Sequence, residues 1–288
     1  MAKSKSHELG ELIGKFIEEV MKEPLREFAQ RSHLYFDSYG LRNARSGPKI
    51  TWKDKYSCSH DLDYVLERGG SENQIGTPVA FIEVAWRSYT KHSKNKVQEI
   101  YGAVNPISEK FHLINPFKGA ILSGKFTVPS LKQLEAQGFD ILYIPFEKVV
   151  EIFKKKDLDI YFDENTPETH IETIIENWRH LSELDFEKIK ESLYIECELE
   201  IKIFIKSLEK SVSREIAHIY VLPLYGNGAD IGDVESAIKF IVDSPDFVDR
   251  VTNLQHIHIS VFYKNGSHIE SDFKSKSEAI DFLNRIVQ

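Results

Sequence analysis

Two carboxylates in the first third of the chain have a spacing that could support chemistry. Asp63 opens a run of strand-forming residues at 63–67, and Glu83 lies inside the apolar run 78–86. Two such runs close together in sequence are expected to pair as a hairpin. Because side chains two positions apart share a face of a strand, the two acids can meet across this pair. They are the first candidates for a functional site.

A divalent cation would explain a carboxylate at position 83. Burial of an unpaired carboxylate is costly, so Glu83 needs either an ion pair, with Arg87 or a lysine, or a metal ion. Mg²⁺ binds through one or two protein carboxylates and takes water and phosphate oxygens as its other ligands. Such an ion stabilises charge on a phosphodiester and lowers the pKa of a bound water. The sequence therefore predicts a site for Mg²⁺ on Asp63 and Glu83, with Mn²⁺ as an expected substitute.

The hydrophobic pattern predicts the elements that would position this pair. They follow the order α, β, β, α, β, α, β, α, which indicates an α/β class with a mixed sheet. The first helix covers residues 9–20, and Pro24 interrupts it or restarts it as a second helix to Ser32. The region 35–55 is expected to be an irregular loop or a short hairpin. The other expected elements are strands 63–67, 78–86, 119–122 and 139–145 and helices 93–104, 131–137 and 149–155.

The order of these elements and the placement of the acids resemble the PD-(D/E)XK nuclease superfamily, particularly type II restriction endonuclease-like proteins. The resemblance covers residues 9–155, roughly half of the chain. It implies a restriction-endonuclease-like core in which Asp63 matches the family's first acid, with Asp61 as the alternative, and Glu83 matches the second. Gln98 falls on the following helix, where the family often places a glutamine.

The lysine of the family pattern is absent from its usual place. Ala85 occupies that position, and its side chain cannot orient or polarise a water. Another cation must therefore act if the chain is an enzyme. Lys94 is the first candidate, because it lies four positions before Gln98 and shares its helix face. The reserve candidates are Lys91, Lys96 and Arg87.

Charge is distributed unevenly along the chain. The net charge of −8 by itself disfavours a polyanionic partner, because nucleic-acid binding depends on Lys and Arg. Residues 42–55 nevertheless hold five bases and one acid, whereas residues 157–176 hold seven acids and no base. A charge run is often only a solvated surface, but beside a nuclease core this one is expected to contact DNA phosphates. The candidates for DNA binding are Arg42, Arg45, Lys49 and Lys53.

The chain is expected to divide into three parts. They are a PD-(D/E)XK-like core at 1–165, a helical connector at 166–212 that could form a dimer interface, and a small α+β domain at 213–288. In the last part, Asn265-Gly266 is typical of a two-residue hairpin turn. The elements expected there are strands 216–224, 257–263 and 268–273 and helices 234–242 and 277–287.

Composition favours a cytoplasmic protein with no membrane partner. Cys58 and Cys197 lie far apart and outside any C-x-x-C spacing, so neither a disulfide framework nor a thiolate zinc site is expected. No stretch approaches the roughly 18 apolar residues of a membrane span, and the polar first residues do not resemble a signal peptide. The sequence shows no methyltransferase motif, so a modification methyltransferase would be a separate chain.

The leading functional prediction is a Mg²⁺-dependent DNA endonuclease of the restriction or phage-defence type. A homodimer with two equivalent sites would serve the cutting of both strands. Two other classes stay open. The first is a non-catalytic DNA-binding module that keeps the fold without a lysine at position 85. The second is an RNA-cleaving defence effector built on the same core.

Overall fold

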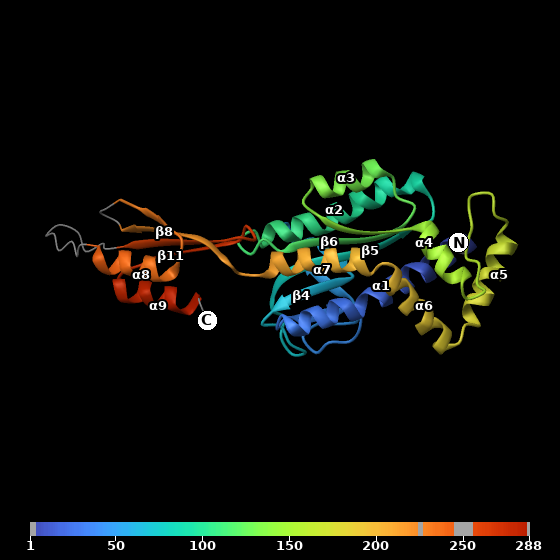
Figure 1. The fold of residues 1–288 in the computed structure, drawn as a ribbon, viewed down its shortest axis with the longest axis horizontal. Helices are drawn as coiled ribbons and strands as arrows, with labels where there is room; N and C mark the ends of the chain where they lie inside the picture. The colour runs from blue at the N-terminus through green and yellow to red at the C-terminus, as the bar shows by residue number, and fades with distance from the viewer. Residues whose placement is uncertain (1–3, 224–226, 245–255, 287–288) are drawn as a thin grey trace. The chain divides into compact units, whose positions relative to one another are not determined.

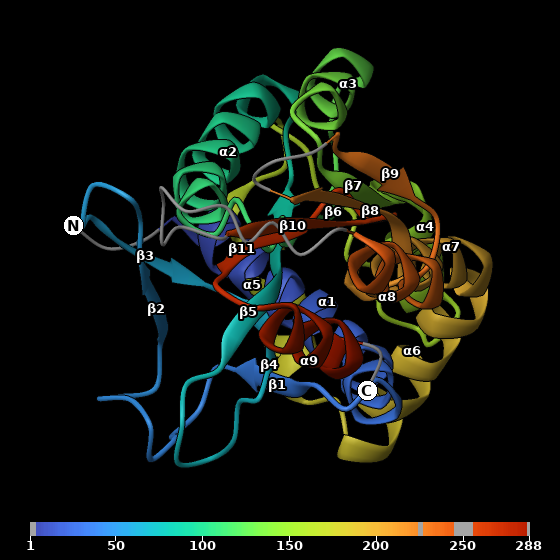
Figure 2. The same cartoon turned by 90° about the vertical axis from the view of Figure 1, so that its left-hand side faces the viewer.

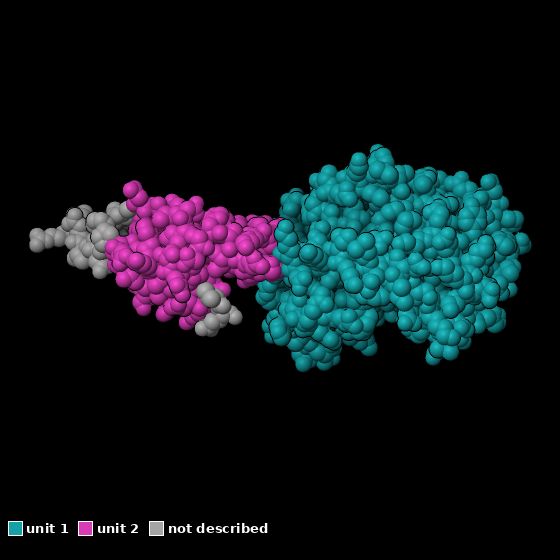
Figure 3. Space-filling view, viewed as in Figure 1, with its two compact units in different colours: residues 1–111, 116–212 teal, residues 112–115, 213–288 magenta. Residues whose placement is uncertain are grey.

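The protein has a mixed α/β fold made of two compact units (Figures 1 and 3). The computed structural model describes residues 4–223, 227–244 and 256–286. The first unit comprises Met1–Phe111 and Pro116–Val212, and the second comprises His112–Asn115 and Ser213–Gln288. No helix within the described ranges is long and apolar enough to cross a membrane.

A five-stranded mixed sheet forms the centre of the first unit, with the strand order β1-β4-β5-β6-β7. The pairs β1–β4 and β4–β5 are antiparallel, whereas the pairs β5–β6 and β6–β7 are parallel. The central strand β5 is buried along nearly its whole length, which accounts for its continuous apolar sequence. The strands are β1 (Tyr35–Ser38), β4 (Tyr64–Arg68), β5 (Thr77–Arg87), β6 (Phe117–Gly124) and β7 (Asp140–Pro145).

Helices cover both faces of this sheet (Figure 2). One face is packed by α2 and α3, and the other by α1, α4 and α7. α5 and α6 pack against α1, so the segment expected as a separate connector is part of the first unit. The helices are α1 (Lys5–Arg31), α2 (Ser93–Lys110), α3 (Val128–Ala136), α4 (Phe146–Lys154), α5 (Glu168–Arg179), α6 (Glu183–Glu196) and α7 (Glu198–Val212), and the 3₁₀ turn Thr90–His92 precedes α2.

The first helix does not break at Pro24. α1 is continuous, and Pro24 lies inside it. A proline removes one N–H from the helical ladder, but the buried stripe continues beyond it through Leu25, Phe28 and Ala29. Packing of this stripe outweighs the missing hydrogen bond, so the expected interruption is wrong. The full length of α1 lets its first half reach the far end of β5, where Gly10 and Gly14 approach Trp86.

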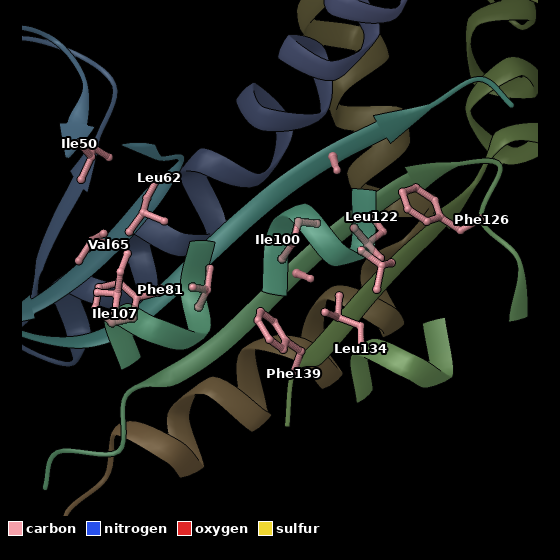
Figure 4. Packing of buried hydrophobic residues seen from close by; sticks show 14 residues of the cluster. Ile50, Leu62, Val65, Phe81, Ile100, Ile107, Leu122, Phe126, Leu134 and Phe139 are labelled. Carbon is pink, nitrogen blue, oxygen red and sulfur yellow. The ribbon is translucent and has the colours of Figure 1, made fainter. Parts of the chain in front are cut away.

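The region 35–55, expected to be an irregular loop or a short hairpin, contains one strand besides β1, and this strand pairs with another that lies just after the region. β2 (Ile50–Lys53) and β3 (Ser59–Leu62) form an antiparallel two-stranded ribbon that stands apart from the main sheet (Figure 2). Its base is part of the hydrophobic core, because Ile50 and Leu62 pack with Phe81 of β5 and with buried residues of α2 (Figure 4). The base of the β2–β3 ribbon is therefore anchored in the core, and Asp63 directly follows its last residue, Leu62.

The second unit is a four-stranded antiparallel sheet with the order β11-β10-β8-β9. Gly266 adopts a φ of 84° in the turn between β10 and β11, as the Asn-Gly signal predicts. The short strand β9 was not expected from the sequence, and the expected end residues Leu224 and Val287 lie outside the described residues. The elements are β8 (Ile216–Pro223), β9 (Ala229–Ile231), α8 (Val234–Asp243), β10 (Ile257–Tyr263), β11 (His268–Phe273) and α9 (Lys276–Ile286).

Two arginines of the basic region lie inside the protein. Only 1% of the Arg42 side chain is exposed, and its guanidinium donates to Asp37 at 2.7 Å and to Glu67 at 2.8 and 2.9 Å. It also donates to the carbonyl oxygens of Ser71 and Gln74. These bonds tie the loop after β1 to the loop between β4 and β5. Arg42 is therefore a structural clamp, and the expectation that it contacts DNA phosphates is wrong.

Arg45 has a similar structural role. Its side chain is 11% exposed and donates to Asp37 and to the carbonyl oxygens of Ser38 and Gly47. Because these donors are engaged, Arg45 is not free to bind a DNA phosphate, and the expectation that it does so is wrong. The exposed lysines of the basic region are Lys49, Lys53 and Lys55.

We predict that Arg42→Ala destabilises the first unit by about 3 to 5 kcal/mol, because it leaves the buried carboxylates of Asp37 and Glu67 without their main cation. Urea denaturation followed by circular dichroism measures this change. Arg26→Ala is the matched control, because the Arg26–Glu23 pair is exposed and such pairs contribute about 0 to 1 kcal/mol. Equal losses for the two variants would contradict the structural role of Arg42.

Candidate active site

The candidate site lies where β4 separates from β5. The pairing of these strands ends at Tyr64 and Ile82, and from Val84 onward β5 pairs with β6 alone among the described strands. Asp63 stands at the point of separation, and its Oδ2 accepts a hydrogen bond from the backbone N–H of Val84 at 2.7 Å. This bond holds the carboxylate against the open edge of β5. Asp63 is thus positioned by a backbone contact and not by the strand that follows it.

Glu83 is the neighbouring acid on β5, and only 8% of it is exposed. It lies two positions from both Phe81 and Ala85 and so shares their face of β5, which packs on the α2 side of the sheet, and its side chain projects toward that side. Its Oε1 is buried and has no hydrogen-bond partner. Burial, and then the negative charge of Asp63, raises the pKa of Glu83 to about 8, while Lys96 and the backbone N–H of Asp63 oppose the shift.

Burial also raises the pKa of Asp63. The hydrogen bond from Val84 and the positive charge of Lys96 lower it again, but the net shift is upward. Two carboxylates that affect each other in a desolvated place resist ionising together. A cation bound between them would offset both the cost of burying the two charges and their mutual repulsion. The pair is therefore a suitable place for a positive ion.

Glu18 of α1 is a third acid near the pair, and no motif or spacing in the sequence selects it. Burial and then the charge of Asp63 raise its pKa to about 7. The hydroxyl of Tyr64 donates to the Glu18 backbone carbonyl at 2.6 Å, which fixes this turn of α1 beside the start of β4. Its neighbours Glu19 and Glu23 are exposed. Only the position of Glu18 beside the buried stripe of α1 distinguishes it in the sequence.

Lys96, and not Lys94, is the lysine of α2 that faces the acids. Its positive charge lowers the pKa of both Asp63 and Glu83, its side chain is 22% exposed, and it lies 3.5 Å from Glu99. Lys94 is exposed and does not line the cleft described below. The buried stripe of α2 begins with Ser93 and Val97, so Lys96 borders the core, whereas Lys94 shares the exposed face of Gln98.

The other reserve cations differ in position. Arg87 ends β5, and its guanidinium lies 3.5 Å from Glu99 and donates to the Trp86 carbonyl at 2.9 Å. Burial lowers its pKa. Lys91 is 58% exposed and pairs with Glu164 at 2.9 Å. Arg87 is therefore close to the site, and Lys91 points to a surface partner.

Asp61, the alternative first acid, is not part of this group. It lies on β3, where its carboxylate binds Lys49 at 2.6 Å and Thr51 at 2.7 Å. These contacts lower its pKa. Asp61 is a solvent-facing residue of the β2–β3 ribbon, and the structure favours Asp63 at the site.

An open cleft of about 730 Å³ adjoins the acids, between α1 and the start of α2. Its floor is the end of β5, including Val84 and Ala85, the two residues after Glu83. Asp63 and Glu83 adjoin this cleft but do not line it. The cationic and neutral polar side chains that line it are Lys15, Lys96, Arg87, His7, His92, Asn95, Ser6 and Ser88, and the acidic ones are Glu11, Glu18 and Glu99.

The donor set fits Mg²⁺ better than a transition metal. Among the described residues, no group of three or more His, Cys, Asp or Glu side chains is arranged to hold a metal ion. Zinc sites need three or four protein ligands, whereas Mg²⁺ is commonly held by one or two carboxylates with water and substrate oxygens. The orphaned oxygen of Glu83 and the raised pKa of both acids agree with such a two-carboxylate site.

Comparison with known proteins adds little. No family model matches the chain, and no curated protein matches it. Among solved structures, it is similar to a protein of unknown function, AF1548, with 11% sequence identity and a TM-score of 0.28. That similarity covers 67% of this chain and 98% of the other. A likeness of this size carries no argument about function, which must come from the site itself.

We predict that the metal-free protein loses stability as pH rises from about 5 to about 8 through Glu83. The folded state keeps the Glu83 proton up to a pKa of about 8, whereas the unfolded chain releases it near 4.5. The folded state therefore binds more protons in this window, and the free energy of unfolding falls as pH increases. Glu83→Gln should remove this contribution, so its stability relative to the wild type should rise by about 3 to 4 kcal/mol between the two ends of the window.

Urea denaturation in a chelating buffer at several pH values measures this difference. Glu19→Gln is the control, because it makes the same change at an exposed acid of α1. A stability difference between Glu83→Gln and the wild type that does not vary with pH would contradict the shifted pKa.

We also predict that Mg²⁺ stabilises the wild type at pH 8 through the same acids. A ligand that binds only the folded state at about 100 times its Kd adds about 2.7 kcal/mol. Thermal unfolding with and without Mg²⁺ should show a rise in Tm that Asp63→Asn or Glu83→Gln abolishes. Asp61→Asn is the matched control and should keep the rise, because Asp61 binds Lys49 away from the pair. An equal rise in all four proteins would place the metal elsewhere.

Proposed function

We propose that the protein is a Mg²⁺-dependent endonuclease that hydrolyses phosphodiester bonds of DNA at Asp63 and Glu83. The observation that carries this proposal is the carboxylate pair with one buried, unpartnered oxygen, next to a cleft whose walls carry Lys15, Arg87 and Lys96 together with three glutamates. The usual alternative for a buried glutamate is an ion pair. No lysine or arginine of the described residues forms an ion pair with Glu83, and the charge of Lys96 offsets its raised pKa only in part.

Asp63 and Glu83 would hold the ion together. When bound, Mg²⁺ supplies the charge that stabilises a phosphodiester under attack and that eases deprotonation of a water. The hydrogen bond from Val84 keeps the Asp63 carboxylate in one orientation. Such preorganisation matters because hydrolysis of a phosphate ester depends mainly on positioning and charge stabilisation.

Lys96 takes the role of the lysine that the family pattern would place at position 85. Its ammonium group acts on both acids from α2, so a cation is available although the strand carries Ala85. Glu18, with a pKa of about 7, can accept a proton at neutral pH from a water in the cleft that it lines. The polar groups that hydrolysis requires are thus supplied by Asp63 directly before β4, and by β5, α1 and α2.

A non-catalytic nucleic-acid-binding protein is the second candidate, and Ala85 is the observation that favours it. The two functions differ in one property. A binding protein needs no divalent ion between Asp63 and Glu83, whereas an endonuclease cuts only when the ion is present. RNA cleavage by the same site is separated from DNA cleavage by the choice of substrate.

We predict that the wild type cuts plasmid DNA in the presence of Mg²⁺ and that Glu83→Gln abolishes cutting. Lys96→Ala should lower the cleavage rate by about 10² or more, the usual effect of losing one charge-stabilising group. Lys94→Ala should stay within about twofold of the wild type, because Lys94 lies on the exposed face of α2. Gel assays on plasmid, single-stranded DNA and RNA measure these rates.

Three results would count against the proposal. Absence of Mg²⁺-dependent cleavage of any of these substrates favours the binding protein. Cleavage of RNA alone moves the substrate from DNA to RNA. A loss of activity in Lys94→Ala that equals the loss in Lys96→Ala would contradict the assignment of Lys96.

A further inference from the structure

The β2–β3 ribbon has an inner face that is part of the core and an outer face that is entirely polar. Its inner side chains include Ile50, Trp52 and Leu62, and Trp52 packs edge-on against Phe81 and Phe111. The outward positions form two cross-strand pairs, Thr51 with Asp61 and Lys53 with Ser59, and all four residues are exposed. Lys49 extends this face at one end and is 66% exposed.

The ribbon is held rigidly at its tip. The Asp54 carboxylate accepts hydrogen bonds from the backbone N–H groups of Tyr56 and Cys58 at 2.8 and 2.9 Å and contacts His60 Nε2 at 2.9 Å. Preorganisation of this kind lowers the entropy cost of binding a partner.

The tip is also attached to the second half of α2. Lys110 Nζ donates to the Lys53 carbonyl at 3.0 Å, and the Lys55 backbone N–H donates to the Pro106 carbonyl at 3.3 Å. Lys55 also forms an ion pair with Glu109. The same helix therefore carries Lys96 beside the acids and supports the ribbon roughly three to four turns further along.

We propose that the β2–β3 ribbon enters the major groove of duplex DNA and holds the duplex against the Asp63–Glu83 site. This inference rests on the proposed endonuclease function. The major groove, about 12 Å wide, admits a two-stranded ribbon. A duplex is favoured over a single strand because binding of single strands uses aromatic stacking surfaces, and no aromatic side chain lies among the outward residues of β2 and β3.

The distance from the ribbon to the acids suits one duplex. Asp61 and Ser59 precede Asp63 by two and four residues, which is roughly 7 and 13 Å of extended chain. Along α2, ten residues separate Lys96 from Pro106, or roughly 15 Å. A groove and an adjacent backbone phosphate are separated by distances of this order. Ribbon and acids can therefore contact the same helical turn.

The chemistry of the outer face suits base edges as well as phosphates. Lys53 forms no ion pair within the described residues and is available to a phosphate or to guanine O6 and N7. Thr51 and Ser59 can donate to or accept from any base. The carboxylate of Asp61 would repel phosphates, but it can accept a hydrogen bond from cytosine N4. This mixture of hydrogen-bond donors and acceptors favours contact with base edges in a groove over purely electrostatic contact with phosphates.

Binding can be measured without cleavage by using full-length protein with Glu83→Gln. The probe is a fluorescent DNA duplex of about two helical turns, and anisotropy gives its Kd. In this background, Thr51→Ala with Lys53→Ala should raise the Kd at least about tenfold, because each base contact contributes about 1 to 3 kcal/mol. Lys132→Ala, which removes an exposed lysine from α3, is the matched control and should leave the Kd unchanged.

A second measurement identifies the groove. Duplex DNA with bulky substituents at cytosine C5, which fill the major groove, should bind at least about tenfold more weakly than unmodified DNA, whereas a drug that occupies the minor groove should not compete. Wild-type affinity of the ribbon variant, competition by the minor-groove drug, or an equal loss of single-strand binding would overturn the proposal. Absence of cleavage by the wild type would instead count against the hydrolytic function and leave the binding results in force.

Discussion

The hydrogen bond from the Val84 N–H to the Asp63 carboxylate is the contact on which the site depends. In a continuing ladder, the N–H of Val84 would bond to the backbone of β4. Here the side chain of Asp63, the residue before β4, takes that place, so the β4–β5 pairing stops without leaving the Val84 N–H unsatisfied. The edge of β5 beyond this point opens toward α1 and α2, and Glu83 lies next to it. This one bond marks the limit of the β4–β5 pairing and orients a carboxylate beside the cleft.

The same arrangement creates the electrostatic problem that a cation would solve. Burial disfavours the charged forms of Asp63 and Glu83, and each carboxylate disfavours ionisation of the other. Glu18 adds a third acid whose pKa is raised for the same reasons. Lys96 offsets part of this charge from a neighbouring helix. A cation on α2 can act on the pair as one on β5 would, because what matters electrostatically is the distance to the acids and not the position in sequence.

Sequence patterns were sufficient for most elements and for the proximity of Asp63 to Glu83, and insufficient where distant segments meet. Most strands and helices followed from local periodicity, including β5 and the β10–β11 hairpin. The continuity of α1 through Pro24 depended on packing against the sheet. The sequence favours Lys94 over Lys96 because Lys94 lies four positions before Gln98, but only the packing of α2 shows which of its faces is buried. The sequence suggests that Arg42 is a surface base, but in the fold it binds Asp37 of β1 and Glu67 of β4.

The internal use of Arg42 and Arg45 changes how the basic region can act. A loop of five cations would have attracted any polyanion, whereas the folded region offers three exposed lysines on and beside a ribbon, one of which pairs with Asp61 and another with Glu109. With so little free positive charge in a protein of net charge −8, non-specific attraction contributes less to binding. Specific contacts then have to contribute more, and the polar outer face of a rigid ribbon one residue before Asp63 is where the first unit can make them.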